Sequence, residues 1–218
     1  MTSLPDDERV GAVAPRRLVV ATGNPHKLDE IRAILTERHE LDVELVSMRE
    51  LDVPEPVEDG ASFEANALIK ARACVVATGL PALADDSGLE VDALNGAPGV
   101  HSARYAGEPS DDAANNRRLV TELADVPAAQ RGARFVCAAV LVTPEGLEQV
   151  RLGTMTGRIV DEPRGGHGFG YDPYFVSDAA GDGRTNAQLT PAEKRTISHR
   201  GAAFRALRPV LQQRFGGR

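Results

Sequence analysis

Residues 19–27, VVATGNPHK, have the composition of an anion-binding turn. An apolar run stops here and is followed by six small, polar or basic residues: Thr22, Gly23, Asn24, Pro25, His26 and Lys27. A strand that runs directly into a helix N-terminus leaves backbone N–H groups and the positive end of the helix dipole facing outward. We therefore expect this turn to hold an anionic group, although an ordinary capped helix would show the same pattern. The glycine spacing is not that of a G-x-x-x-x-G-K-[ST] phosphate loop.

The segment 84–88, ADDSG, places two adjacent carboxylates after a short apolar run. We expect the strand to end here in a polar turn, with Asp85 and Asp86 pointing in different directions. One carboxylate would then face a cleft while the other holds the loop. A carboxylate at such an edge suits Mg²⁺, which takes oxygen ligands and is commonly bound by protein carboxylates and substrate phosphates together.

A second oxygen ligand could come from the acidic loop 51–60, LDVPEPVEDG, which holds Glu55, Glu58 and Asp59. A solvated run of charges would have the same composition, so the loop alone does not distinguish a metal ligand from surface charge.

The segment 165–173, GGHGFGYDP, combines four glycines with aromatic residues and a carboxylate. Glycines let the backbone approach a flat ligand closely. We expect Phe169 or Tyr171 to stack on a base, with the backbone, including Gly170, and Asp172 bonding the edge of that base. A mobile hairpin tip is the alternative interpretation.

A cationic cluster lies in 192–200, AEKRTISHR, with Lys194, His199 and Arg200 near one helix. Such a cluster suits phosphate oxygens or a purine carbonyl. Lysine is scarce in this chain: among 25 Lys plus Arg residues, only Lys27, Lys70 and Lys194 are lysine. Lys27 and Lys194 fall in candidate segments, whereas Lys70 lies in the middle of a predicted helix, and we expect its replacement by arginine to be mild.

Periodicity and capping signals predict alternating strands and helices. The expected strands are 17–22, 41–48, 81–88, 133–143 and 147–160, with a further short strand after the glycine-rich loop. The expected helices are 25–39 capped at Asn24, 62–78 capped at Ser62, 109–124 capped at Ser110, and 190–215 opened by the capping box Thr190–Glu193. This order indicates an α/β protein with a mixed sheet, in which the two long strands from 133 to 160 form an antiparallel pair.

Composition limits the function classes. The net charge of −7 disfavours a sequence-independent nucleic-acid binder or RNA-binding module. No stretch approaches the ~20 apolar residues of a membrane span. The start MTSLPDDERVGAVAPRR is not a secretory signal, and we expect 1–15 to be a disordered polar tail. Cys74 and Cys137 lie in apolar runs, which indicates buried thiols and a cytoplasmic protein.

Five segments occur in an order that resembles the inosine triphosphate pyrophosphatase family: ATGNPHK, SFEANALIKA, ADDSGLEVDALNGAPGVHSARYAG, FGYDP and LTPAEKRTISHRG. The resemblance covers about residues 17 to 210. It implies an elongated α/β fold with a long mixed sheet and flanking helices, in which 16–218 form one domain with two lobes around a central cleft. It also implies a homodimer and Mg²⁺-dependent hydrolysis of ITP, dITP and XTP to the monophosphate and pyrophosphate.

The resemblance also assigns residue roles. Asp86 would be the general base and a Mg²⁺ ligand, and Ser87 would touch the substrate. Residues 22–27 would hold the triphosphate, and the base pocket would be lined by Phe169, Gly170, Tyr171 and Asp172. Lys194, His199 and Arg200 would complete the purine and phosphate contacts.

One departure concerns the metal. Many relatives have a glutamate pair in EETG, the first of which is taken as a metal ligand, whereas the matching stretch here is VEDG, with Val57 first and Glu58 second. Glu58 is therefore the expected stand-in. Two rival functions remain at this stage: a related enzyme that clears modified pyrimidine triphosphates, and a nucleotide-binding sensor without turnover.

Overall fold

The computed structural model describes residues 16–37 and 41–216, so the predicted tail 1–15 lies outside the described residues. Six strands form one sheet in the order β2-β1-β3-β4-β5-β6. Their bounds are β1 Arg16–Val20, β2 Val43–Ser47, β3 Ala82–Val91, β4 Gly132–Val142, β5 Glu148–Ile159 and β6 Phe175–Ser177. β1 is parallel to β2 and β3, and the other pairs are antiparallel. The predicted α/β class and mixed sheet are confirmed, including the antiparallel pair β4–β5.

Five α-helices flank the sheet in the described part of the chain. They are α1 Pro25–Thr36, α2 Phe63–Thr78, α3 Asp112–Glu122, α4 Pro191–Ile197 and α5 His199–Phe215. Short 3₁₀ helices lie between them: η1 Met48–Leu51, η2 Asp92–Leu94, η3 Gly99–Arg104, η4 Ala128–Gln130, η5 Asp172–Tyr174, η6 Asp178–Ala180 and η7 Asn186–Gln188. No described helix is long and apolar enough to cross a membrane.

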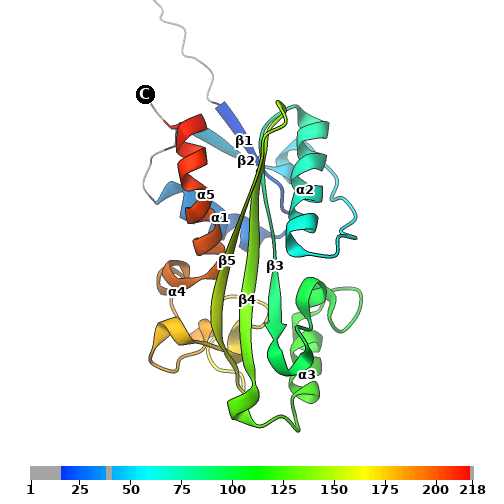
Figure 1. Cartoon of the computed structure of the whole chain (residues 1–218), viewed down its shortest axis with the longest axis vertical. Coiled ribbons are helices and arrows are strands. Elements are labelled where there is room, and N and C mark those ends of the chain that lie inside the picture. Colours follow the sequence, from blue (N-terminus) through cyan, green and yellow to red (C-terminus); the bar gives the residue numbers. More distant parts are fainter. Residues whose placement is uncertain (1–15, 38–40, 217–218) are drawn as a thin grey trace, which may run out of the picture.

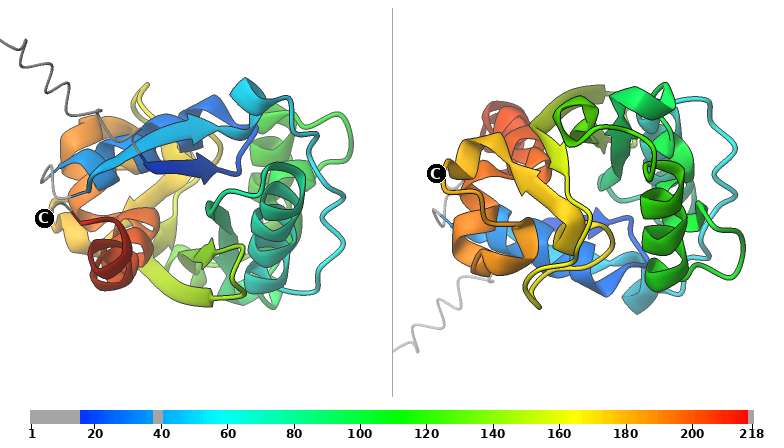
Figure 2. Two further views of the ribbon diagram at one scale, coloured as in Figure 1. Left: turned by 90° about the horizontal axis from the view of Figure 1, so that it is seen from above. Right: turned by 90° about the horizontal axis from the view of Figure 1, so that it is seen from below.

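The two faces of the sheet bury different helices. Leu18 and Val20 pack in the cluster that contains α1 and α5 residues, whereas Val19 and Ala21 pack in the cluster that contains α2 residues. This alternation follows from the period of two along a strand, so that the apolar run 18–21 serves both faces. Figures 1 and 2 show α5 and α2 on opposite sides of the long strands.

The long strands β3, β4 and β5 run along the length of the molecule, as Figure 1 shows. Its upper half contains α1, α2 and α5, and α3 lies beside its lower half. A third core cluster, which includes Leu119 of α3 and Phe175 of β6, packs on the continuation of the strands. The same strands therefore provide a core to both halves and fix how the halves lie relative to each other.

The predicted end of a strand at 81–88 is wrong. β3 continues to Val91, and Asp85 and Asp86 lie in mid-strand opposite Ala139 and Ala138 of β4. The polar residues do not end the strand because a long apolar partner strand continues the hydrogen-bonded ladder beside them.

Two predicted helix boundaries also differ. α3 is shorter at both ends than the expected 109–124, and Asp111, not Ser110, caps it by accepting a hydrogen bond from the Ala114 N–H at 3.0 Å. The predicted helix 190–215 is two helices, since Ser198 is extended (φ −69°, ψ 148°) and caps α5 by accepting from the Gly201 N–H at 3.0 Å. α1 ends at Thr36, and the last predicted residues of that helix, 38–39, lie outside the described residues.

Candidate active site

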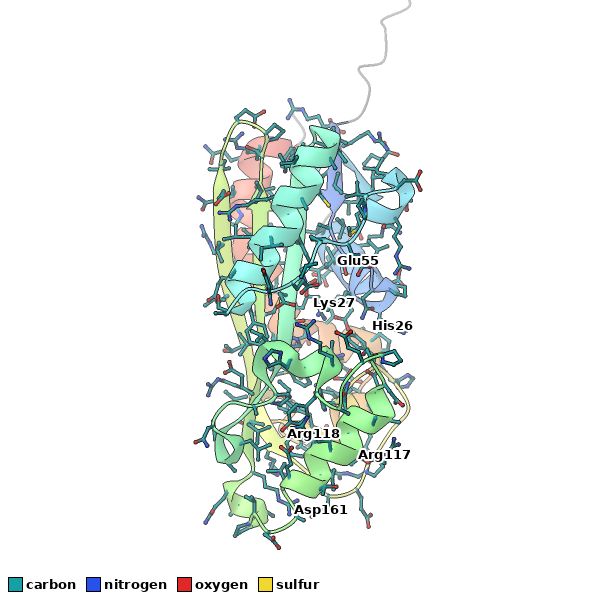
Figure 3. The ribbon with its side chains drawn as sticks, turned by 90° about the vertical axis from the view of Figure 1, so that its right-hand side faces the viewer. His26, Lys27, Glu55, Arg117, Arg118 and Asp161 are labelled. Carbon is teal, nitrogen blue, oxygen red and sulfur yellow. The ribbon has the colours of Figure 1, made fainter. Side chains whose placement is uncertain are left out.

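A cavity of about 330 Å³ collects almost all of the predicted site residues. It is lined by Thr22, Gly23, Asn24, His26, Lys27, Glu58, Asp86, Ser87, Phe169, Gly170, Tyr171, Asp172, Lys194, His199 and Arg200. Pro25 does not line it. Figure 3 shows Glu55, Lys27 and His26 at the junction of the two halves, with Arg117 and Arg118 on α3 below them. Segments that are far apart in the sequence therefore meet at one cleft.

The turn before α1 is held by its own side chains. Asn24 Oδ1 accepts hydrogen bonds from the N–H groups of His26 (2.9 Å) and Lys27 (3.2 Å), while the Asn24 N–H donates to Thr22 Oγ1 (3.2 Å). The expected supply of free N–H groups is thus smaller than the sequence suggested. Glu55 lies over the turn, because a Cβ added to Gly23 would come within 1.3 Å of Glu55 Oε1.

Asp85 is completely buried and faces cations. Its Oδ2 lies 3.4 Å from Lys27 Nζ and accepts hydrogen bonds from Arg200 Nε (3.1 Å) and Nη2 (3.0 Å). Burial alone would raise the pKa of Asp85, but Lys27 and Arg200 hold that pKa well below its ordinary value. Asp85 is therefore a permanent carboxylate that positions two cations.

Asp86 points the other way and meets different partners. Its Oδ1 accepts from Lys70 Nζ at 3.3 Å and its Oδ2 accepts from Asn66 Nδ2 at 3.1 Å. The same Lys70 Nζ donates to Glu58 Oε2 at 3.1 Å. Burial lowers the pKa of Lys70, but the neighbouring carboxylates of Asp86, Asp85 and Glu58 raise it above its ordinary value, so Lys70 remains an ammonium.

Sequence reasoning missed Lys70 and Asn66 as site residues. Both lie on the buried face of α2 and contact Asp86. The expectation that Lys70 matters less than Lys27 and Lys194 loses its basis, because all three lysines line the cavity. A usable signal was present: Asn66 and Lys70 are four residues apart, on one face of a helix whose buried positions are otherwise apolar.

The glycine-rich loop is held from inside by Asp172, which is only 2% exposed. Its Oδ2 accepts from Lys194 Nζ (2.6 Å) and the Phe169 N–H (3.0 Å), and its Oδ1 accepts from Asn186 Nδ2 (3.1 Å). Both oxygens are engaged by the protein. The carboxylate therefore holds the loop, and the expectation that Asp172 also bonds the edge of a base stays a prediction.

The same loop is held from outside by α3. Gly170 has a φ of +60°, and its N–H donates to Asp112 Oδ2 at 2.8 Å while its C=O accepts from Asn116 Nδ2 at 2.9 Å. The next residue, Tyr171, donates from its hydroxyl to the Ser102 carbonyl at 2.8 Å. The loop between Phe169 and Asp172 is thus fixed by both neighbouring segments, η3 and α3. No sequence pattern predicted these contacts.

The C-terminal cations share a carboxylate from α1. Glu30 bonds to Arg200 and lies 3.3 Å from Lys194 Nζ, and Arg200 Nη2 donates to Ser87 Oγ at 2.8 Å. Lys194 lies on α4, whereas His199 and Arg200 lie on α5, because the predicted single helix breaks at Ser198.

His199 is buried and stacks on Phe135, with ring centroids 4.9 Å apart. Burial, and then the neighbouring Arg200, lower the pKa of His199 well below 6.5, so the imidazole is neutral. Its Nδ1 is buried and has no hydrogen-bond partner among the described residues. A buried orphan nitrogen in the wall of a cavity is available to a ligand.

Comparison with known proteins places the chain among close relatives. The Ham1 family profile matches residues 18–210. The dITP/XTP pyrophosphatase of Frankia alni is 54% identical over 202 residues, covering 90% of this chain and 98% of the relative. The solved HAM1 protein of Coxiella burnetii is 41% identical with a TM-score of 0.82, covering 91% of this chain and 99% of that one. The solved nucleoside-triphosphatase / dITP/XTP pyrophosphatase of Mycobacterium abscessus is 54% identical with a TM-score of 0.71, covering 89% and 99%.

Proposed function

The chain belongs to the Ham1 family, and we propose from this that it hydrolyses the non-canonical purine nucleoside triphosphates ITP, dITP and XTP to the monophosphate and pyrophosphate. The observation that carries the proposal is the meeting of three features at one cavity. These are the Asp86–Lys70–Glu58 group, the cationic pair Lys27 and Arg200, and a loop that carries Phe169. Carboxylates, cations and an aromatic ring are the groups that a nucleoside triphosphate requires.

We propose that Asp86 and Glu58 hold Mg²⁺. Both carboxylates converge on a single cation, Lys70 Nζ, at 3.3 and 3.1 Å, so the pair has the charge and the proximity that a hard cation requires. Among the described residues, no group of three or more His, Cys, Asp or Glu side chains could hold a metal. Two carboxylates complemented by water and phosphate oxygens is the usual manner in which Mg²⁺ is held beside a phosphate substrate.

The residues of the chain then act as follows. Asp86 accepts a proton from a water molecule whose oxygen forms a bond to the α-phosphorus, and the bond from that phosphorus to the bridging oxygen of the β-phosphate breaks. Pyrophosphate leaves with the bridging oxygen. Asn66 orients Asp86 through its 3.1 Å hydrogen bond, and Lys27 offsets phosphate charge. When bound, Mg²⁺ supplies further positive charge to the phosphate oxygens.

The test is release of pyrophosphate and orthophosphate from a panel of purine and pyrimidine nucleoside triphosphates, with and without Mg²⁺. We expect ITP, dITP and XTP to give pyrophosphate, only with the metal, and Asp86→Asn to lower turnover by ~10²–10⁴-fold. Preferred hydrolysis of pyrimidine triphosphates would favour the rival enzyme. Binding without turnover would favour a sensor, and orthophosphate as the first product would contradict attack at the α-phosphorus.

Three further assignments remain proposals. We propose a homodimer, which the family resemblance implies and a measurement of molar mass in solution tests.

A cytoplasmic location is supported by the unpaired, buried Cys74 and Cys137. One two-lobed domain over residues 16–218 is supported by the three strands that run through both halves, and limited proteolysis that separated two stable lobes would contradict it.

A further inference from the structure

His26 and Phe169 form a stack between segments that are far apart in the sequence. Their ring centroids are 5.4 Å apart and the ring planes differ by 14°. His26 lies on the first turn of α1, and Phe169 lies on the glycine-rich loop. Both line the cavity of the candidate active site. Figure 3 shows His26 beside Lys27 where the upper half meets the lower half.

The imidazole of His26 makes no hydrogen bond or ion pair with the described residues, and its recorded contact is the ring of Phe169. Its backbone N–H is not free for a phosphate either, because it donates to Asn24 Oδ1 at 2.9 Å. Lys27, the next residue, points its ammonium at Asp85, 3.4 Å away. Two adjacent residues of α1 therefore serve different parts of the site.

The backbone of Phe169 is held, because its N–H donates to Asp172 Oδ2 at 3.0 Å. The position of its ring therefore depends on the side chains that surround it. Its ring also lies near two cations, with Lys194 Nζ 5.1 Å from the ring centroid and the Arg200 guanidinium 6.0 Å from it. These cations are themselves fixed by carboxylates, so His26 is the one exposed and adjustable contact of the ring among those recorded.

The stack also separates two cavities. A second cavity of about 490 Å³ lies against the first, and His26, Phe169 and Lys194 line both. Without the imidazole, the Phe169 ring has space to move toward the second cavity. The wall against which a purine would stack would then be displaced.

We propose that His26 is a positioning residue of the base subsite, which holds Phe169 against the purine and takes no part in binding the triphosphate. The proposal rests on the proposed function, and it reassigns a residue that the sequence placed with the phosphates. An aromatic pair of this kind contributes the equivalent of roughly 2- to 10-fold in affinity.

The test compares His26→Ala and His26→Phe with the unchanged protein. We expect His26→Ala to raise the KM for ITP roughly 2- to 10-fold with little change in kcat, and His26→Phe to restore the KM because it keeps a flat ring. The inhibition constant of inorganic tripolyphosphate, which carries the phosphates without a base, should be the same in all three proteins.

Two outcomes would overturn the role of His26. A loss of tripolyphosphate inhibition as large as the rise in KM would make His26 a phosphate ligand, and an unchanged KM in His26→Ala would make the stack irrelevant to substrate binding. Turnover of ITP by the unchanged protein is measured first in the same series. Its absence would refute the proposed function, whereas turnover with an equal KM in all three proteins overturns the His26 proposal alone.

Discussion

At the residue scale, the candidate site depends on two adjacent carboxylates with opposite surroundings. The pleat of β3 sends Asp85 toward Lys27 and Arg200, and Asp86 toward Lys70 and Asn66. Asp85 is fully buried and bound by cations, so it orders the cation side of the cleft. Asp86 lines the cavity and is the carboxylate that can meet substrate. One residue of displacement along a strand thus separates a carboxylate bound by cations from one that lines the cavity.

The neutral state of His199 predicts a pH dependence of stability. Its pKa is lowered by burial, so below pH 6.5 the unfolded chain binds a proton at this imidazole while the folded protein does not. The free energy of unfolding is therefore unaffected by this imidazole above pH 6.5, and it decreases as the pH falls below 6.5. Each pH unit below 6.5 lowers the free energy of unfolding by at most ~1.4 kcal/mol for this proton, or by about 2 kcal/mol between pH 6.5 and pH 5.

The variant His199→Phe keeps a flat ring against Phe135 and cannot be protonated. We expect its free energy of unfolding, measured in urea at pH 7 and at pH 5, to fall less on acidification than that of the unchanged protein. The difference between the two slopes isolates His199 from the other histidines, whatever the substitution costs at pH 7. Equal slopes would mean that the buried imidazole becomes protonated without penalty.

The sequence predicted side chains whose role follows from local chemistry, and it missed those whose role comes from tertiary packing. Local chemistry predicted Lys27 from its place at a helix start and the pair Asp85 and Asp86 from two adjacent carboxylates, but only the family resemblance singled out Asp86. Lys70 was underestimated because a lysine in mid-helix is ordinarily solvated. Only the approach of β3 to α2 brings Asp86 within 3.3 Å of its ammonium.

At the scale of elements, α3 holds the glycine-rich loop with two side chains that lie one helical turn apart. Asp112 and Asn116 bond the N–H and the C=O of Gly170, respectively. Asn116 is buried and Gly170 is half-buried, so losing the amide leaves the Gly170 carbonyl without its donor. We expect Asn116→Leu to lower the free energy of unfolding by ~1–3 kcal/mol and to raise the KM for ITP by several-fold. Urea unfolding and steady-state kinetics measure the two effects.

Asp112 provides the matched control. Asp112→Asn keeps an oxygen that can accept from the Gly170 N–H, whereas Asp112→Ala removes it. We therefore expect Asp112→Ala to raise the KM for ITP more than Asp112→Asn, while the inhibition constant of inorganic tripolyphosphate is unchanged in both. If the two substitutions have the same effect on KM, the hydrogen bond to Gly170 does not position the loop.

Element boundaries were predictable where caps decide them. Asn24, Ser62 and the Thr190–Glu193 capping box start their helices as the sequence indicated. The break at Ser198 was not predicted, because a serine inside a helical pattern is usually tolerated. Here its hydroxyl caps α5. That arrangement depends on where α5 must lie on β4 and β5, and the local sequence does not contain this information.

At the scale of the whole molecule, a network of charges joins the two halves around the cavity. Glu30 of α1 accepts hydrogen bonds from Lys194 of α4 and Arg200 of α5. Arg200 also donates to Asp85 of β3, and Lys194 also donates to Asp172 of the glycine-rich loop. The groups expected to contact phosphate and base are therefore parts of one connected set. A substrate that spans the cleft would meet cations that are already held in place, so little reorganisation is needed on binding.

The contacts within the glycine-rich loop limit which groups can contact a purine base. From the sequence, we expect the backbone of the glycine-rich loop to bond the edge of the base, and its N–H groups at 169–172 could donate to an oxygen at C6. Those of Phe169, Gly170 and Asp172 are instead bonded within the protein. The remaining candidates are the Tyr171 N–H, which donates no hydrogen bond to the described residues, and two side chains. These are His199, whose Nδ1 has no partner among those residues, and Arg200, which can only donate.

Selection against ATP then depends on donors that face C6. A purine with an oxygen at C6 accepts from them, whereas the amino group of adenine leaves a donor unpaired, at a cost of ~1–3 kcal/mol or roughly 5- to 150-fold. We expect kcat/KM for ITP and XTP to exceed that for ATP by this factor when the nucleotides are measured side by side. GTP shares the C6 oxygen, so it must be refused at C2, and its kcat/KM measures that edge separately. If ATP is hydrolysed as efficiently as ITP, the side chains of His199 and Arg200 do not read C6, and the enzyme could not remove non-canonical purines without also consuming ATP.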